Sequence, residues 1–229
     1  MYCSLRHFCG ENTMARLTRS DIFCRTQSNC IFTECTAAAG RQLTDQPSSL
    51  SDSDDPRRML IKDQILLFSQ YFAIDLITFS MDSKCLRQLL RSKPQLAEQF
   101  SPHEVARRWL IVCPSVRRHA APLHQPSEQD INQLCDDPDR IETIRWQLGD
   151  VAWWHRLLCQ RIAQDCNRRD KLPGPFWAGR YHSILLPDTL SLLLCQAFID
   201  TSSSTTTTTT WEQVDCVHHR NLRVHGHHN

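Results

Sequence analysis

Apolar residues recur at helical spacing from residue 56 onward, and this pattern predicts the first regular elements. The first run carries Met59, Leu60, Ile61, Ile65, Leu66, Phe68 and Phe72, a spacing that favours a helix. The β-leaning stretch "FAIDLITF" follows it directly. The stretch "CLRQLL" at residues 85–90 has the composition of a returning strand, with Asp82 and Ser83 near the turn. The pattern therefore predicts a helix followed by a β-hairpin.

Two further helical regions follow the predicted hairpin. In "SPHEVARRWL", Ser101 stands at the N-cap position, with a proline and a glutamate in the first turn. The stretch "DDPDRIETIRWQLGDVAWWHRLLCQRIAQDCNRRD" opens with an Asp-Pro start signal, and Gly149 indicates a break between two helices. One apolar stripe runs through Ile141, Ile144, Leu148, Val151, Leu158 and Ile162. We expect Trp146, Trp153 and Trp154 to pack in or beside the core rather than to stack on bases.

The two ends of the chain have weaker patterns. Isolated apolar residues and the polar tract "QPSSLSDSDDP" predict a poorly ordered insert over residues 11–55. The stretch "RYHSILL" predicts a short strand, and Pro187 and Asp188 predict the entry to a last helix. Residues 201–229 begin with serines and threonines and predict a disordered, low-complexity tail. Histidines and a cysteine near its end could gather a metal ion, but their spacing matches no defined site, so an unstructured tail is favoured.

Composition narrows the class of protein without fixing its function. The chain has 229 residues, of which 41% are hydrophobic, so it can close a core of ordinary size. Its 26 basic and 25 acidic side chains give no global field that would by itself indicate nucleic acid or a membrane. The 12 cysteines show no C-x-x-C spacing and follow no apolar leader, which favours a reduced, cytoplasmic protein. No apolar run is long enough for a membrane span.

A local basic and aromatic segment is the first indication of a partner. Between residues 139 and 180 the basic residues outnumber the acidic ones, with tryptophan and phenylalanine interleaved. This composition suits single-stranded nucleic acid, because cations follow the phosphates while aromatic faces accept any base. A solvated helix face has the same composition, so composition alone does not decide between the two interpretations.

The order of residues 162–200, "IAQDCNRRDKLPGPFWAGRYHSILLPDTLSLLLCQAFID", resembles the core of the REP-associated tyrosine transposases, a branch of the HUH single-strand DNA transposases. The resemblance covers residues 56–200, with residues 101–146 similar to a helical insert of one subgroup and residues 1–10 similar to the family's first strand. It implies an α+β fold: a ferredoxin-like antiparallel sheet with helices on one face, plus the insert. The matching positions, in ungapped order, are Asn167, Arg168, Asp170, Gly174, Phe176, Trp177, Gly179, Arg180, Tyr181 and Ser183.

The resemblance also implies a chemistry whose residues have been replaced in this chain. The family cuts DNA by attack of a tyrosine hydroxyl, assisted by Mg²⁺ or Mn²⁺ held by two histidines and a polar residue one turn after the tyrosine. The two histidine positions are Cys85 and Arg87, the tyrosine position is Phe198, and the polar position is Ser202. Arginine offers no lone pair, and a thiolate is a poor ligand for hard ions. No intact catalytic residue or metal ligand, and no cofactor, is therefore expected.

Two functions remain open from the sequence. In the first, a catalytically inactive relative of transposases binds single-stranded or hairpin DNA; the contact residues expected from the resemblance are Arg168, Arg169, Trp177, Arg180 and His182. Tyr181 and His182 are candidate substitutes for the lost nucleophile and ligand, though in-line attack tolerates little misplacement. In the second, the chain is a non-enzymatic protein-interaction module, or a decayed gene product with no activity. An exposed apolar patch would favour protein contact over DNA binding. The sequence does not choose between a monomer and a dimer.

Overall fold

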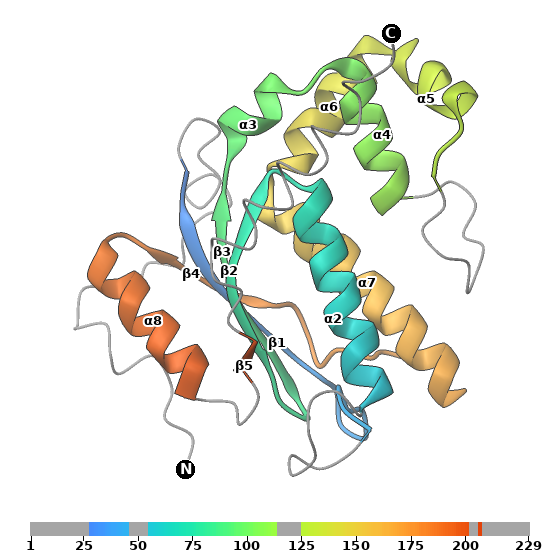
Figure 1. Cartoon of the computed structure of the whole chain (residues 1–229). Helices are drawn as coiled ribbons and strands as arrows, with labels where there is room; N and C mark the ends of the chain where they lie inside the picture. Colours follow the sequence, from blue (N-terminus) through green and yellow to red (C-terminus); the bar gives the residue numbers. More distant parts are fainter. Residues whose placement is uncertain (1–27, 46–54, 114–124, 202–205, 208–229) are drawn as a thin grey trace, which may run out of the picture.

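A five-stranded antiparallel sheet organises the chain in the computed structural model, which describes residues 28–45, 55–113, 125–201 and 206–207 (Figure 1). The strands lie in the order β4-β1-β3-β2-β5. Their bounds are Cys30–Thr36 for β1, Ile74–Met81 for β2, Cys85–Ser92 for β3, His182–Leu186 for β4 and Thr206–Thr207 for β5. The predicted hairpin is confirmed as β2 and β3, which pair from Ile74 opposite Ser92 to Met81 opposite Leu86.

The connections between the strands give a ferredoxin-like arrangement. Helix α2 (Pro56–Tyr71) joins β1 to β2, and helix α7 (Val151–Asp170) precedes β4. The first four strands and these two helices follow the order β-α-β-β-α-β, and the strand order 4-1-3-2 matches it. The expected α+β fold with an antiparallel sheet is therefore confirmed.

The helical insert lies between β3 and α7. It contains α3 (Pro94–Gln99), α4 (Pro102–Val112), α5 (Glu128–Cys135) and α6 (Pro138–Leu148). Figure 1 shows these helices gathered at one end of the sheet. The insert begins earlier than the sequence predicted, because Pro94 starts a short helix directly after β3.

Side-chain caps fix the starts of helices α4, α6 and α7. The Ser101 hydroxyl accepts a hydrogen bond from the Glu104 amide at the start of α4. Asp137 caps α6 in the same way, and Asp150 caps α7. Gly149 stands between these two helices, as its position in the pattern predicted.

The main core lies between the sheet and helices α2 and α7. Trp154 of α7 is fully buried at its centre, with its ring edge-on to Phe68 at 5.8 Å and to Phe72 at 5.5 Å between centroids. All six residues of the predicted stripe from Ile141 to Ile162 are buried. The expectation that Trp154 packs in the core is confirmed, whereas Trp146 keeps 39% of its surface exposed.

A second, smaller core lies on the other face of the sheet, under helix α8 (Thr189–Thr201). There Cys195 and Ile199 pack against Phe32 of β1 and Leu89 of β3. Figure 1 shows α8 and α2 on opposite sides of the sheet. The expectation that the helices cover one face is therefore wrong: α8 covers the second face.

The central strand β1 corrects the prediction for residues 11–55. This strand lies inside the segment predicted to be poorly ordered, and Ile31, Phe32 and Thr33 are all buried. Strand β1 is covered on both faces and carries polar residues inward, so it lacks the alternation of apolar and polar residues that would have predicted a strand. The expected first strand at residues 1–10 lies outside the described residues, as do residues 11–27 and 46–54.

Within residues 201–229, the structure describes Thr201 and the strand β5. This strand pairs with β2, Phe79 opposite Thr207 and Ser80 opposite Thr206. The rest of the predicted tail, including its histidines, lies outside the described residues. In the part of the chain that the structure describes, no helix combines the length and apolar character needed to cross a bilayer.

Candidate functional site on the α8 face of the sheet

Three positions that the resemblance equates with catalytic residues meet on the face of the sheet that α8 covers. Cys85 and Arg87 are two residues apart on β3, so their side chains share a face with Leu89, which packs under α8. The guanidinium carbon of Arg87 lies 6.0 Å from the centre of the Phe198 ring. Phe198, on α8, also meets Phe32 edge-on at 6.3 Å between centroids. The fourth position, Ser202, lies outside the described residues.

Arg87 is held by two carboxylates at this place. Its Nε donates to Glu34 Oε2 at 2.8 Å, and a terminal nitrogen donates to Asp82 Oδ2 at 2.9 Å. Burial disfavours the charged guanidinium, but the hydrogen bond to Asp82 and the nearby carboxylates raise the pKa of Arg87. Arg87, which the resemblance equates with the second histidine, therefore carries a positive charge that is held in place.

Cys85 is a neutral thiol beside this ion-pair cluster. Burial raises the pKa of the Cys85 thiol, although a contact with the Thr36 hydroxyl at 3.7 Å acts in the opposite direction. A neutral thiol and a paired guanidinium offer no lone pair suited to a hard ion such as Mg²⁺ or Mn²⁺. The residues present do not fit the divalent ion that the resemblance implies.

Tyr181 does not lie near Phe198, the position that the resemblance equates with the nucleophilic tyrosine. Its ring stacks on His155 of α7, with 4.3 Å between centroids and 19° between planes. Helix α7 packs on the face of the sheet opposite α8, whereas His182, the next residue, pairs with Glu34 in the register of the sheet. The Tyr181 ring and Phe198 therefore lie on opposite faces.

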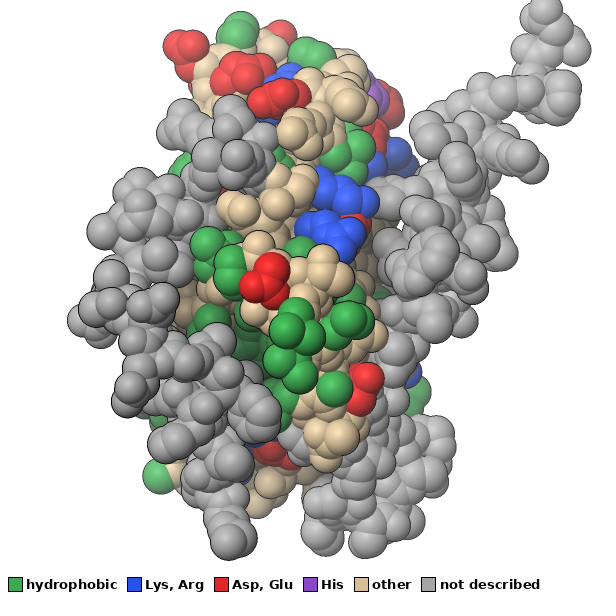
Figure 2. All heavy atoms as spheres, turned by 90° about the vertical axis from the view of Figure 1, so that its left-hand side faces the viewer, with side chains coloured by type: hydrophobic (Ala, Val, Ile, Leu, Met, Phe, Trp, Pro, Cys, Tyr) green, Lys and Arg blue, Asp and Glu red, His purple; other side chains and the backbone are tan. Residues whose placement is uncertain are grey.

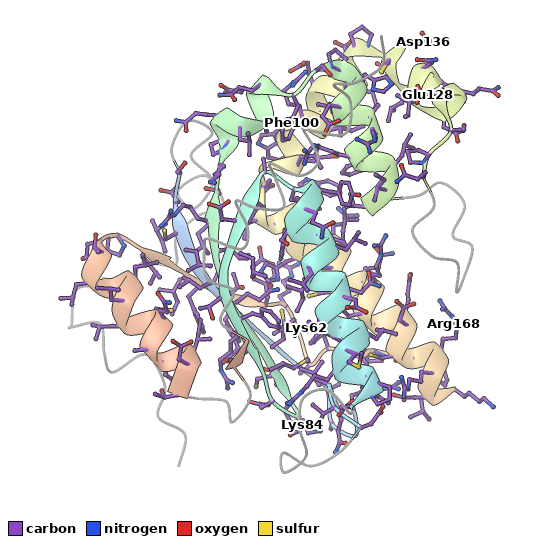
Figure 3. The ribbon with its side chains drawn as sticks, viewed as in Figure 1. Lys62, Lys84, Phe100, Glu128, Asp136 and Arg168 are labelled. Atoms are coloured by element: carbon purple, nitrogen blue, oxygen red, sulfur yellow. The ribbon has the colours of Figure 1, made fainter. Side chains whose placement is uncertain are left out.

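The residues expected to contact DNA fall into two groups. Arg168 and Arg169 lie in the last turn of α7, and Figure 3 shows Arg168 at the free end of that helix. Arg180 and His182 are exposed at the start of β4, and His182 stands in the same row of the sheet as Glu34 and Arg87. The structure thus brings His182 to the α8 face, but it places the two arginines of α7 on the other side of the sheet.

The Trp177 side chain is half-buried and packs against neighbouring residues. Its indole nitrogen donates to the carbonyl of Cys159 at 2.9 Å, and its ring meets Phe176 edge-on at 5.0 Å. Phe176 is buried, and the backbone of Trp177 bridges to Ala37 beside β1. These contacts anchor the turn before β4 into the core.

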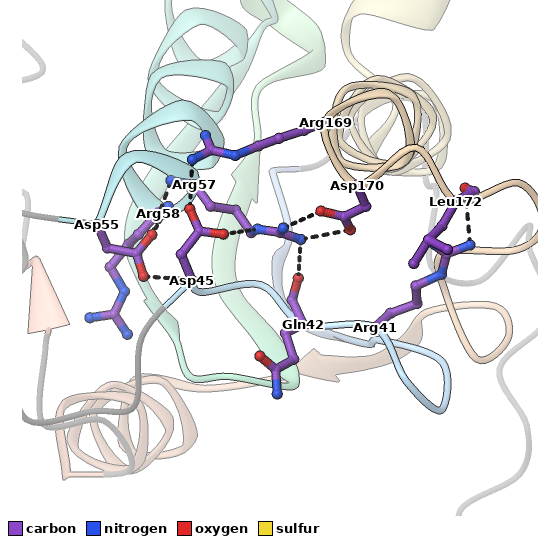
Figure 4. Close-up of polar contacts among 9 residues, drawn as sticks. All are labelled: Arg41, Gln42, Asp45, Asp55, Arg57, Arg58, Arg169, Asp170 and Leu172. Atoms are coloured by element: carbon purple, nitrogen blue, oxygen red, sulfur yellow. Dashed lines mark hydrogen bonds and ion pairs between the residues drawn. The ribbon is translucent and has the colours of Figure 1, made fainter.

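A polar network accounts for the charged residues near the end of α7 (Figure 4). Arg57, at the start of α2, donates to Asp45 at 2.7 Å and to Asp170 at 3.1 Å. Arg169 donates to the other oxygen of Asp45 at 2.7 Å. Burial opposes the charge of Arg57, but the hydrogen bonds to Asp170 and Asp45 raise its pKa. Asp170 and Arg169, two residues of the motif region, thus join α7 to α2 and to the loop after β1.

The fold brings together a second group of side chains, three potential metal ligands that the sequence did not predict. Cys35 of β1 lies near His155 and Cys159 of α7, and one ligand atom from each comes within 4.8 Å of the other two. The hydrogen bond with Cys159 and burial hold the pKa of the Cys35 thiol well above its usual range. The only sequence signal is the spacing of His155 and Cys159 by one helical turn, because Cys35 lies in the segment predicted to be poorly ordered.

Comparisons with known proteins leave the family open. No family model matches the chain, and neither a curated protein nor a solved structure matches it. The function of the chain is therefore inferred from the motif resemblance and from the geometry of the site.

Proposed function

We propose that this protein binds single-stranded or hairpin DNA through a transposase-like domain that does not cleave it. The observation that supports this proposal is the meeting of Cys85, Arg87 and Phe198 on one face of the sheet. The motif resemblance equates these positions with catalytic ones, although Phe198 is more than a hundred residues from the other two in the chain. A chance similarity of motifs would not require Arg87 and Phe198 to be neighbours.

Cleavage is excluded from the proposal on chemical grounds. Attack on a phosphodiester needs a nucleophilic oxygen in line with the phosphorus atom. Phe198 has no such oxygen, and Arg87 brings a paired cation to a place where a metal ligand would be needed. Because Arg87 is bonded to Glu34 and Asp82, contact with a phosphate is assigned to exposed guanidinium groups, whose planar fork of donors matches phosphate oxygens.

The exposed basic side chains define where DNA would lie. His182 is exposed on the edge strand β4, in the same row of the sheet as Arg87, and Arg180 is exposed just before that strand. With almost balanced charge over the chain, affinity would have to come from such local contacts. Arg168 retains 48% of its side-chain surface and could extend the contact around the end of α7.

A gel assay tests the absence of cleavage. The wild-type chain and the Phe198→Tyr variant are incubated with Mg²⁺ or Mn²⁺ and a 5′-tailed DNA hairpin, and covalent adducts are sought on a denaturing gel. We expect no adduct with either protein, because Phe198→Tyr restores a hydroxyl but not the metal ligands. A wild-type adduct that disappears in Tyr181→Phe would show that the domain is an active enzyme.

Binding by charge-removing variants tests the proposed surface. Arg180→Ala should weaken binding of a labelled hairpin by about 3- to 10-fold, the loss expected for one phosphate contact. Arg107→Ala removes a partly exposed arginine from the helical insert and serves as the matched control. Equal affinities of the two variants would place the DNA elsewhere.

One observation favours a second candidate function, protein contact. Leu190, Leu193 and Leu194 of α8 are 66%, 56% and 47% exposed. Figure 2 shows hydrophobic side chains gathered on the face that this helix presents. Exposed apolar patches commonly mark protein interfaces. Self-association that is measured by sedimentation and lost in Leu193→Glu, but kept in Gln196→Glu on the same helix, would favour this function; hairpin binding without self-association would favour the first.

A further inference from the structure

We propose that Cys35, His155 and Cys159 form a binding site for a thiophilic metal ion, with Zn²⁺ as the ion of best fit. The site lies between β1 and α7, on the face of the sheet opposite Arg87 and Phe198. It is therefore separate from the site of the proposed DNA-binding function and does not rest on it.

The elements of the fold bring the three ligands together. His155 and Cys159 are one turn apart on α7, so both project from the same side of the helix. Cys35 comes from the central strand that this helix covers, and its side chain points into the main core. Ligands held by a strand and a long helix are fixed by packing on rigid elements rather than on loops.

The distances suit a tetrahedral zinc site. With Zn–S bonds of about 2.3 Å and Zn–N bonds of about 2.0–2.1 Å, two sulfurs on one ion stand about 3.8 Å apart, and a sulfur and a nitrogen about 3.5–3.6 Å apart. The sulfurs of Cys35 and Cys159 are 3.5 Å apart, and Cys35 Sγ is 3.8 Å from Nδ1 of His155. Shifts of a few tenths of an ångström would make these two edges match.

The donor set selects the kind of metal. Two thiolates and one imidazole favour Zn²⁺ and other soft ions over the hard Mg²⁺ and Mn²⁺. Binding would replace the two thiol protons, which pass to the buffer, and form two Zn–S bonds and one Zn–N bond. The described residues supply three ligands, which leaves a fourth position for water or another donor.

The surroundings of His155 and Cys159 hold both ligands of α7 in place. His155 is 1% exposed, and among the described residues its Nε2 atom has no hydrogen-bond partner. Because Nδ1 is the ring nitrogen that faces the Cys35 sulfur, Nδ1 would bind the ion and Nε2 would carry the ring proton. Tyr181 stacks on the ring, and Trp177 donates to the Cys159 carbonyl, so both ligands of α7 are held in place.

Cobalt titration of the full chain tests this site. The protein is freed of metal with a chelator, kept reduced, and titrated with Co²⁺ while the thiolate-to-cobalt charge-transfer absorption is recorded. We expect saturation at about one equivalent. The absorption should be lost in Cys35→Ser and Cys159→Ser and retained in Cys166→Ser, a buried cysteine of the same helix outside the cluster. It should also be retained in Cys216→Ser, in the tail.

A stability measurement guards against variants that fail to fold. Addition of Zn²⁺ should raise the Tm of the wild-type chain and of Cys166→Ser, but not that of His155→Gln. The proposal is overturned if the wild-type chain gives no charge-transfer absorption, or if this absorption persists in all three ligand variants. It is also overturned if mass spectrometry of the untreated chain finds Cys35 and Cys159 joined as a disulfide.

Discussion

At position 87 the resemblance predicts a metal-ligating histidine, and the chain places there an arginine bonded to Glu34 and Asp82. A guanidinium at this position would repel a metal ion rather than bind it. The two carboxylates that could otherwise attract an ion are engaged by this same guanidinium. At the residue scale, the site is stabilised as an ion-pair cluster, with Phe198 packed beside it.

The buried thiol of Cys166 leads to a prediction on the pH dependence of stability. Burial, above all, raises the pKa of Cys166 from 9.0 to about 11. Between these values the folded chain keeps a proton that the unfolded chain loses, so the free energy of unfolding should fall as pH rises from about 9 to 11. We expect a loss of about 1–2 kcal/mol from this group.

Urea unfolding at several pH values across this window measures the effect. The Cys166→Ala variant should show a shallower decline than the wild-type chain, whatever its absolute stability. Parallel declines in the two proteins would mean that Cys166 ionises equally in the folded and unfolded states.

At the element scale, the start of α2 and the end of α7 are joined by Arg57. Its side chain is 9% exposed and is bonded to Asp45, to Asp170 and to the carbonyl of Gln42. These partners come from the loop after β1 and from the last residue of α7. The network therefore holds three segments that are distant in sequence.

Removal of Arg57 should be strongly destabilising. Arg57→Ala would leave two carboxylates beside one another in a partly buried place, and we expect the free energy of unfolding to fall by about 3 kcal/mol. Arg107 is partly exposed and forms an ion pair with Glu104, and Arg107→Ala should change the free energy of unfolding by less than about 0.5 kcal/mol. Denaturant unfolding of both variants provides the comparison, and equal losses would show that the network adds no stability.

The elements differ in how far the sequence predicts them. Helices α2, α4, α6 and α7 follow from periodicity and from caps such as Ser101 and Gly149, because these signals are local. Strand β1 does not, because Thr33 and Glu34 face inward and find partners in Gln88 and Arg87, which only the folded sheet supplies. The Cys35 cluster was missed for the same reason.

The candidate site was predictable only in part. Periodicity gave no reason to associate Arg87 with Phe198, and the motif resemblance alone paired their positions. The DNA contact expected of Trp177 stays a prediction, and its indole is bonded to the Cys159 carbonyl. A basic and aromatic composition cannot separate residues that anchor a turn from residues that await a partner.

At the scale of the whole molecule, the two faces of the sheet have different contents. One face carries the main core, with α2, α7 and the Cys35 cluster, and the other carries α8, with Phe198 beside Arg87. The chain has a formal net charge of only +1, so DNA binding has to depend on local basic side chains such as Arg180. Affinity should then fall with salt according to a small number of phosphate contacts.

The proposed DNA-binding function is tested most directly by one measurement: the affinity of the wild-type chain for a labelled single-stranded hairpin at two salt concentrations. With about three to five phosphate contacts, fluorescence anisotropy should show binding that weakens by roughly 20- to 500-fold between 50 and 200 mM salt. An absence of binding at low salt, or an affinity that does not change with salt, would contradict the proposed DNA-binding function.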